Sequence, residues 1–141
     1  MAGLYARLAA AVDALPLAPG MRVLEIGCGP GAAARAVAAR IAPGHVLAID
    51  RSPRAIAQAR AACAAEIAAG ALSLRCAAVE ELELSPGEPR FDLAFAVRVG
   101  VLDGRHPGAA GAALQRIAAA LRPGGALYVG DGADMRAVRL G

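Results

Sequence analysis

The sequence of 141 residues contains no Trp, no Lys, and only two Phe and two Tyr. A core must therefore be built from Ala, Val, Leu and Ile, which suits helices packed closely against a sheet. All 15 basic residues are Arg, a bias toward GC-rich codons that says nothing about chemistry. The length suits one domain with a substantial core, so we expect a single domain over residues 1–141.

Cysteines are also few. Cys28, Cys63 and Cys76 are odd in number and show no C-x-x-C spacing, which argues against a disulfide framework or a zinc site. We therefore expect reduced thiols, a cytoplasmic location and no metal. Arg7 and Asp13 interrupt the N-terminal stretch, so no secretory signal is predicted. No apolar run reaches the ~20 residues needed to span a bilayer, so no membrane association is expected.

The net charge of +3 does not form one basic stretch. Residues 1–60 carry seven Arg and three acids, residues 61–100 three Arg and six acids, and residues 101–141 five Arg and three acids. No Arg cluster is interleaved with aromatic residues, so a nucleic-acid partner is not expected. The acids between Glu80 and Glu88 are interpreted as a solvated rim.

Apolar runs alternate with helical patterns along the chain. Strands are predicted at 21–26, 45–49, 71–77, 91–99 and 126–129, and helices at 4–15, 30–41, 52–69 and 109–121. This alternation predicts an α/β, Rossmann-like, mostly parallel sheet of about five strands with helices on both faces. Right-handed crossovers would place the first strand centrally and open a ligand crevice at the carboxyl ends of strands one and four. The tail from Gly132 is interpreted as too short for more than a fragment of structure.

Gly27, Gly29 and Gly31 follow the first strand, and Asp50 ends the second. Glycines accept φ > 0 and leave no Cβ between backbone and ligand. A carboxylate at the tip of the next strand can accept hydrogen bonds from both ribose hydroxyls. The glycine pattern alone does not separate NAD from other nucleotides. Glu25, two residues before Gly27, would repel a pyrophosphate and suits an ammonium group.

Four stretches occur in order over residues 20–131: VLEIGCGPG, VLAID, PRFDLAFAVRV and LRPGGALYV. This set resembles the motifs of class I S-adenosylmethionine-dependent methyltransferases, as a small, C-terminally abbreviated member. The resemblance implies that S-adenosylmethionine is the cofactor and that its methyl group is transferred to an acceptor. A small-molecule acceptor is preferred over protein or RNA.

The resemblance also implies a cofactor site. Glu25 and the turn from Gly27 to Gly31 would hold the methionine part, Asp50 the ribose hydroxyls, and Arg51 would flank the adenine. The other residues expected to bind cofactor are Cys28, Val79, Glu80, Val97 and Arg98. Arg98 equally suits the acceptor site, and no catalytic residue is assigned.

The sequence departs from the family pattern in two places. Family members often carry an acid directly after strand three, where this chain has Ala77 and Ala78. Glu80 or backbone amides would then read the adenine. The family sheet usually ends in an antiparallel strand pair, and this chain is expected to lack that pair. The strand-five edge would then be open or covered by a homodimer.

Several other residues have a chemical and a structural interpretation. Cys28 is interpreted as a small spacer rather than a nucleophile, and Asp92 as a structural carboxylate rather than a base. His106, near Asp103 in the loop above the crevice, has the pKa range of a general base, but an exposed loop histidine is the simpler interpretation. Tyr5 would pack or cover the site from the first helix.

Two alternatives to a methyltransferase stay open. An NAD(P)-binding oxidoreductase shares the G-x-G-x-x-A pattern, although Glu25 and the Pro-Gly-Gly before strand five argue against it. A non-catalytic module that binds the cofactor or a partner would explain an abbreviated sheet.

Overall fold

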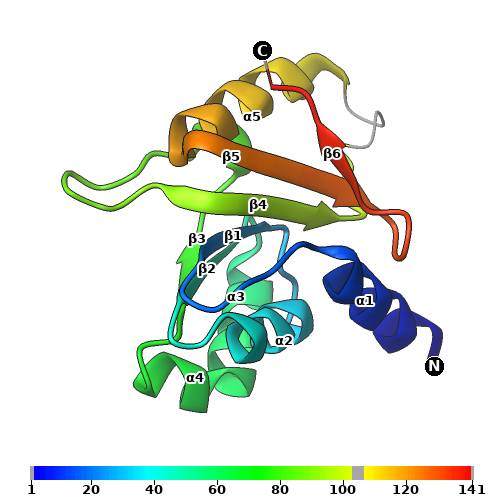
Figure 1. Cartoon of the computed structure of the whole chain (residues 1–141), viewed down its shortest axis with the longest axis vertical. Helices are drawn as coiled ribbons and strands as arrows, with labels where there is room; N and C mark the ends of the chain where they lie inside the picture. Colours follow the sequence, from blue (N-terminus) through cyan, green and yellow to red (C-terminus); the bar gives the residue numbers. More distant parts are fainter. Residues whose placement is uncertain (1, 103–106, 141) are drawn as a thin grey trace.

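A computed structural model describes residues 2–102 and 107–140, and these form one six-stranded sheet in the order β3-β2-β1-β4-β5-β6 (Figure 1). The helices are α1 (Ala2–Ala14), α2 (Ala32–Ile41), α3 (Pro53–Ala62), α4 (Ala64–Ala68) and α5 (Pro107–Ala120), with the 3-10 helix η1 (Val79–Glu81). The strands are β1 (Arg22–Ile26), β2 (His45–Asp50), β3 (Leu72–Cys76), β4 (Phe91–Val97), β5 (Leu121–Gly130) and β6 (Arg136–Val138).

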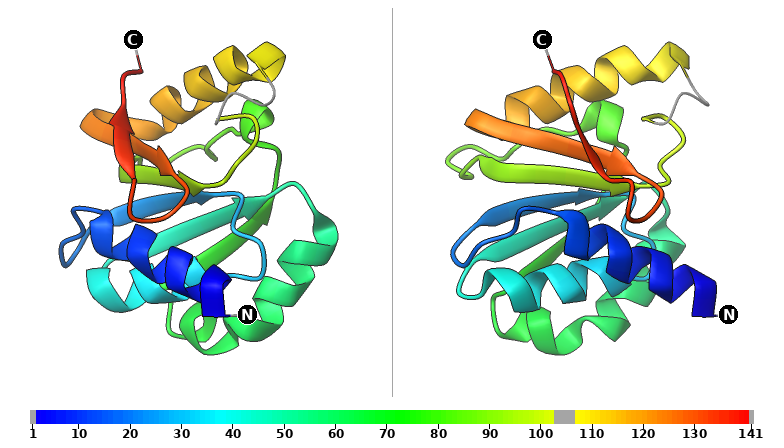
Figure 2. Two further views of the ribbon diagram at one scale, coloured as in Figure 1. Left: turned by 90° about the vertical axis from the view of Figure 1, so that its right-hand side faces the viewer. Right: turned by 45° about the vertical axis from the view of Figure 1, so that its right-hand side comes forward.

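The first five strands run parallel, and β1 lies between β2 and β4, as the crossover rule predicts. Figure 2 shows α1 to α4 on one face of the sheet and α5 on the other. Alternate strand residues divide the core between these faces, with Val23 in the cluster that includes α2 and Leu24 in the cluster that includes α5. The core is built from aliphatic residues and alanine, with only Phe91 and Phe95 as buried aromatics among the described residues.

The expectation that the sheet lacks a final antiparallel pair is wrong, because β6 runs antiparallel to β5. Val129 pairs with Arg136. Asp134 makes this return possible, since its Oδ1 accepts hydrogen bonds from the amides of Asp131 and Gly132 at 2.7 and 2.9 Å. Because this tight turn uses few residues, even a short tail adds a strand. β6 therefore pairs with β5 over Leu127, Tyr128 and Val129, and the open edge that suggested a homodimer there loses its basis.

Strand β5 also begins earlier than its sequence indicates. The Pro-Gly-Gly turn signal lies inside the strand, because Phe91 pairs with Leu121 whereas Leu93 pairs with Ala126. The extra residues form an irregular bulge in which Gly124 has a φ of 85°. Helix 52–69 is likewise divided, since Cys63 separates α3 from α4.

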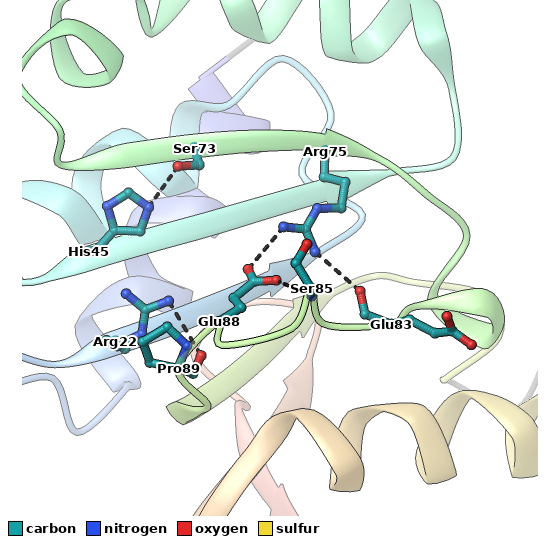
Figure 3. A network of polar contacts seen from close by, with 8 residues as sticks. All are labelled: Arg22, His45, Ser73, Arg75, Glu83, Ser85, Glu88 and Pro89. Atoms are coloured by element: carbon teal, nitrogen blue, oxygen red, sulfur yellow. Dashed lines mark hydrogen bonds and ion pairs between the residues drawn. The ribbon is translucent and has the colours of Figure 1, made fainter.

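A polar network fastens the connection between β3 and β4 (Figure 3). Arg75 Nη2 lies 2.9 Å from Glu88 Oε2, and the Ser85 amide donates to Glu88 Oε1 at 2.8 Å. Burial opposes ionisation of Glu88, but the hydrogen bonds from Arg75 and Ser85 outweigh it and hold the pKa of this carboxyl below its ordinary value. Glu88 is therefore a structural anchor rather than part of a solvated rim.

Candidate functional site

Two hollows adjoin at the carboxyl ends of the central strands. The larger, about 490 Å³, runs from β1 across the ends of β2 and β3. Its walls are Ile26, Gly27, Ile49, Asp50, Arg51, Ala77, Ala78, Val79, Glu80, Arg98, Val99, Gly100, Val101 and Ala109. The smaller, about 200 Å³, lies between α1 and the glycine turn and includes Glu25 and Cys28. Gly27 and Arg98 border both hollows, so the two are neighbours, and together they are called the crevice below.

The glycine turn leaves β1 with positive φ angles of 70° at Gly27 and 95° at Gly31. A Cβ on Gly27 would lie 2.7 Å from Val99 Cγ2, and one on Gly31 would lie 2.6 Å from Cys63 Sγ. Both positions therefore exclude a side chain, but they lie in different surroundings. Gly27 borders the crevice, whereas Gly31 packs against the end of α3 and lines neither hollow.

Asp50 joins the glycine turn to the end of β2. Its Oδ2 accepts a hydrogen bond from the Gly29 amide and its Oδ1 one from the Ser52 amide, each at 2.9 Å. Asp50 thus holds the turn and also lines the larger hollow, where a ligand could reach it. A carboxylate oxygen has more than one lone pair, so both oxygens keep the capacity to accept from a ligand.

Glu25 is the one buried charged residue among those described, with 3% of its surface exposed. Its Oε1 has no hydrogen-bond partner within the described residues. Burial, and secondly the charge of Asp50, raise the pKa of Glu25 to about 8. A buried carboxyl oxygen without a partner is costly, so its presence in a hollow indicates a place for a cationic or donor group.

Cys28 fits the spacer interpretation. Burial, with the charges of Glu25 and Asp50 beside it, raises the pKa of its thiol to about 12. The side chain therefore stays protonated near neutral pH and is a poor nucleophile.

Arg98 forms a corner where the crevice meets the end of β5. It directly follows β4 in the left-handed region, with a φ of 56°, and its amide donates to the Gly130 carbonyl at 2.9 Å. Arg98 Nε and Arg7 Nη1 lie 3.2 and 3.5 Å from Asp131 Oδ1, so α1 is tied to the ends of β4 and β5. Neither Arg7 nor Asp131 is among the residues that the sequence predicts for the site, since neither lies in one of the four motif stretches.

A third hollow of about 380 Å³ lies beyond this corner, against the ends of β4, β5 and β6. Its walls are Ala96, Arg98, Val99, Leu102, Val129, Gly130, Asp131, Asp134 and Arg136. Sequence reasoning did not find this hollow because it depends on β6, which was not expected.

The remaining candidates divide between the crevice and other places. Val97 lines the smaller hollow, while Arg51, Val79 and Glu80 line the larger one with Ala77 and Ala78. Tyr5, 69% exposed, borders the smaller hollow from α1. Asp103 and His106 lie outside the described residues.

Asp92 has the structural role expected for it. It lies at the amino end of β4, where its Oδ2 accepts from the Arg22 amide at 2.8 Å and its Oδ1 lies 2.6 Å from Arg122 Nε. In the part of the chain that the structure describes, no group of three or more His, Cys, Asp or Glu could hold a metal ion. None of the helices described is long and apolar enough to cross a bilayer.

Comparison with known proteins identifies the family. Residues 23–125 match the model of a methyltransferase domain. The chain is 35% identical over 118 residues to trans-aconitate 2-methyltransferase of Methylobacterium nodulans. The alignment covers 82% of this chain and 40% of that relative. The chain thus spans less than half of that relative's length.

Two solved structures are similar in fold and sequence. The CcbJ methyltransferase from Streptomyces caelestis has a TM-score of 0.69 and 26% identity, covering 89% of this chain and 48% of the other. The [4+2]-cyclase SpnF has a TM-score of 0.70 and 27% identity, covering 86% and 42%. The family model matches most of this chain, which therefore belongs to the class I methyltransferase domain family. S-adenosylmethionine is the methyl donor of this family.

Proposed function

We propose that this chain binds S-adenosylmethionine in the crevice and transfers its methyl group to a small-molecule acceptor. The observation that carries the proposal is Glu25, a buried carboxyl whose Oε1 lacks a partner within the described residues and which faces a hollow beside the glycine turn. A ligand with an ammonium group and no pyrophosphate fits this position. NAD would instead bring phosphates toward a carboxylate.

The residues lining the crevice suggest a division of roles. Glu25 would pair with the ammonium group, and Gly27, Cys28 and Gly29 would offer backbone atoms to the methionine part. Asp50 would accept from the ribose hydroxyls, since it lies between the glycine turn and the larger hollow. Gly31 would shape the turn from behind rather than touch the ligand.

The far part of the larger hollow suits the adenine. Arg51, Val79 and Glu80 line it, and Glu80 is the acid available to meet the adenine amino group. Val97 and Arg98, at the end of β4, would border the methyl-transfer end of the cofactor.

The cofactor supplies an electrophilic methyl group on its sulfonium. The protein then has to position a nucleophile in line and exclude water, which can lower the barrier by several kcal/mol. Cys28 is a protonated thiol and takes no covalent role. Positioning by the crevice walls is therefore the main catalytic contribution of the described residues.

A small-molecule acceptor is supported by the relative named for trans-aconitate, a small carboxylic acid. A nucleic-acid partner is not part of the proposal, because no Arg cluster interleaved with aromatics occurs in the sequence. The cytoplasmic location remains a prediction from the cysteines.

Thermal shifts with S-adenosylhomocysteine, S-adenosylmethionine and NAD, run side by side, test the cofactor. A ligand at ~100 times its Kd should stabilise the protein by about 2.7 kcal/mol. We expect this from the first two ligands; stabilisation by NAD alone would contradict the proposal.

A turnover assay separates an enzyme from a binding module. One similar structure is named a cyclase, so this fold is not by itself evidence of methyl transfer. Release of S-adenosylhomocysteine that depends on an added acceptor would support the enzyme. Binding without turnover across a panel of small carboxylic acids would favour the non-catalytic module.

A further inference from the structure

We propose that the third hollow is the acceptor subsite and that Arg136, on β6, binds a carboxylate of the acceptor. This inference rests on the proposed function and names the chemical class of the substrate. It assigns a role to the strand that was not expected from the sequence.

The position of the hollow links it to the cofactor crevice. Arg98 lines the third hollow and both hollows of the crevice, and Asp131 lines the third and the smaller hollow. The third hollow is therefore a neighbour of the end of the crevice to which methyl transfer is assigned. Its volume of about 380 Å³ suits a small molecule. Val99, Leu102 and Val129 give it apolar walls, and four charged residues also line it: Arg98, Asp131, Asp134 and Arg136.

The charges around this hollow favour an anion. Asp131 is already shared by Arg98 and Arg7, and Asp134 accepts two backbone amides in the β5–β6 turn. Those amides, and then nearby Arg136, hold the pKa of Asp134 below its ordinary value, so it stays ionised in this turn. Arg98 and Arg136 thus line the hollow beside two aspartates that already have partners, and Arg7 adds a third positive charge through its contact with Asp131. The sulfonium of a bound cofactor would add further positive charge.

Arg136 is the cation available to a ligand. Within the part of the chain that the structure describes, it makes no ion pair, although it lines the hollow. Its backbone pairs with Val129 in the antiparallel ladder, so its side chain starts from a fixed point on the sheet. A guanidinium can hold a carboxylate through two parallel hydrogen bonds, which orients the acceptor as well as binding it.

The test measures binding of tricarballylate, a flexible tricarboxylate, to protein saturated with S-adenosylhomocysteine. Calorimetry compares wild type, Arg136→Gln and Arg139→Gln. Arg139 is a matched control, because it is an exposed arginine in the same tail that lines none of the three hollows. The neutral triamide of the same acid serves as a control for shape.

We expect tricarballylate to bind wild type and Arg139→Gln equally, and Arg136→Gln about tenfold more weakly, as for a lost charged hydrogen bond. The triamide should bind none of them measurably. Failure of wild type to bind tricarballylate, equal weakening in both variants, or equal affinity for the triamide would overturn the inference.

Affinity for S-adenosylhomocysteine is measured first in each protein and should be unchanged. Loss of that binding in wild type would count against the proposed cofactor instead. The carboxylate titrations would then be run on the free protein, where the same difference between Arg136→Gln and Arg139→Gln decides the role of Arg136.

Discussion

Two glutamates lie in opposite electrostatic environments. One lines the crevice, and the other belongs to the polar network that fastens the connection between β3 and β4. Glu88, with 16% of its side chain exposed, accepts hydrogen bonds from Arg75 and the Ser85 amide, and its pKa falls. Glu25, 3% exposed, has an oxygen without a partner in the described residues, and its pKa rises to about 8. Burial alone therefore does not identify a functional carboxyl. The absence of an internal partner distinguishes the one that faces a ligand hollow from the one that holds a loop.

The largest expected effect is on the pH dependence of stability. The pKa of Glu25 is raised in the folded state from 4.5 to about 8, so folding binds a proton between these values. Stability should fall as pH rises through that window, by up to ~1.4 kcal/mol per pH unit from this group. Urea unfolding of wild type and Glu25→Gln at pH 5, 6, 7 and 8 checks this, and the variant should lose that slope.

Glu88→Gln should change the pH dependence of stability in the opposite direction. Because the folded-state pKa of Glu88 is lowered, its contribution is present above its unfolded pKa and is lost as pH falls. This variant should be less stable than wild type at neutral pH and converge with it in acid. If the two glutamine variants changed the pH profile in the same direction, the comparison between the sites would fail.

The next effect is on cofactor affinity. Asp50→Ala should weaken binding of S-adenosylhomocysteine by about 1.5–3 kcal/mol, the usual worth of hydrogen bonds to a charged group. Asp92→Ala is the control, because Asp92 pairs with Arg22 and Arg122 at the other end of the sheet. It should lower stability and leave the affinity of the folded protein unchanged. Wild-type affinity in Asp50→Ala would remove Asp50 from the site.

A pair of glycine substitutions separates backbone strain from site shape. Gly27 and Gly87 have positive φ angles of 70° and 80°, but only at Gly27 would a Cβ collide, with Val99. Each Ala variant should be less stable by about 1–2 kcal/mol from the left-handed backbone. Gly27→Ala should also weaken cofactor binding, whereas Gly87→Ala should not. Equal affinities in calorimetry would show that the collision is absorbed without reshaping the crevice.

The smallest expected effect is on stability, from a substitution in the polar network between β3 and β4. Arg75→Ala should cost about 0.5–1 kcal/mol of stability, because a partly exposed ion pair is worth little. Cofactor affinity should stay at the wild-type value. A double-mutant cycle with Glu88→Gln measures the pair itself, and a coupling energy near zero would assign the cost to lost packing of the Arg75 side chain.

Much of the crevice could be predicted from the sequence because its residues follow strands. Alternating strands and helices place Gly27, Asp50 and Val79 at one edge of a parallel sheet, whatever the details of packing. The burial of Glu25 follows from its place in the central strand.

The parts that could not be predicted depend on contacts between distant segments. β6 has too few residues for a period-two pattern, and it forms because the β5 edge and the turn made by Asp134 are both available. The third hollow could not be predicted either, because β6 and its turn form part of its walls. The left-handed backbone of Arg98 has no local signal, since such angles are typical of glycine.

The most direct test of the account is titration of S-adenosylhomocysteine at pH 6.5 in buffers with different ionisation enthalpies. If Glu25 is protonated in the free protein and pairs with the ligand's ammonium group, wild type should release about one proton on binding. Glu25→Gln should release none and bind more weakly. Heats that are independent of the buffer in wild type, together with equal affinities, would contradict the assignment of Glu25 as the partner of the cofactor.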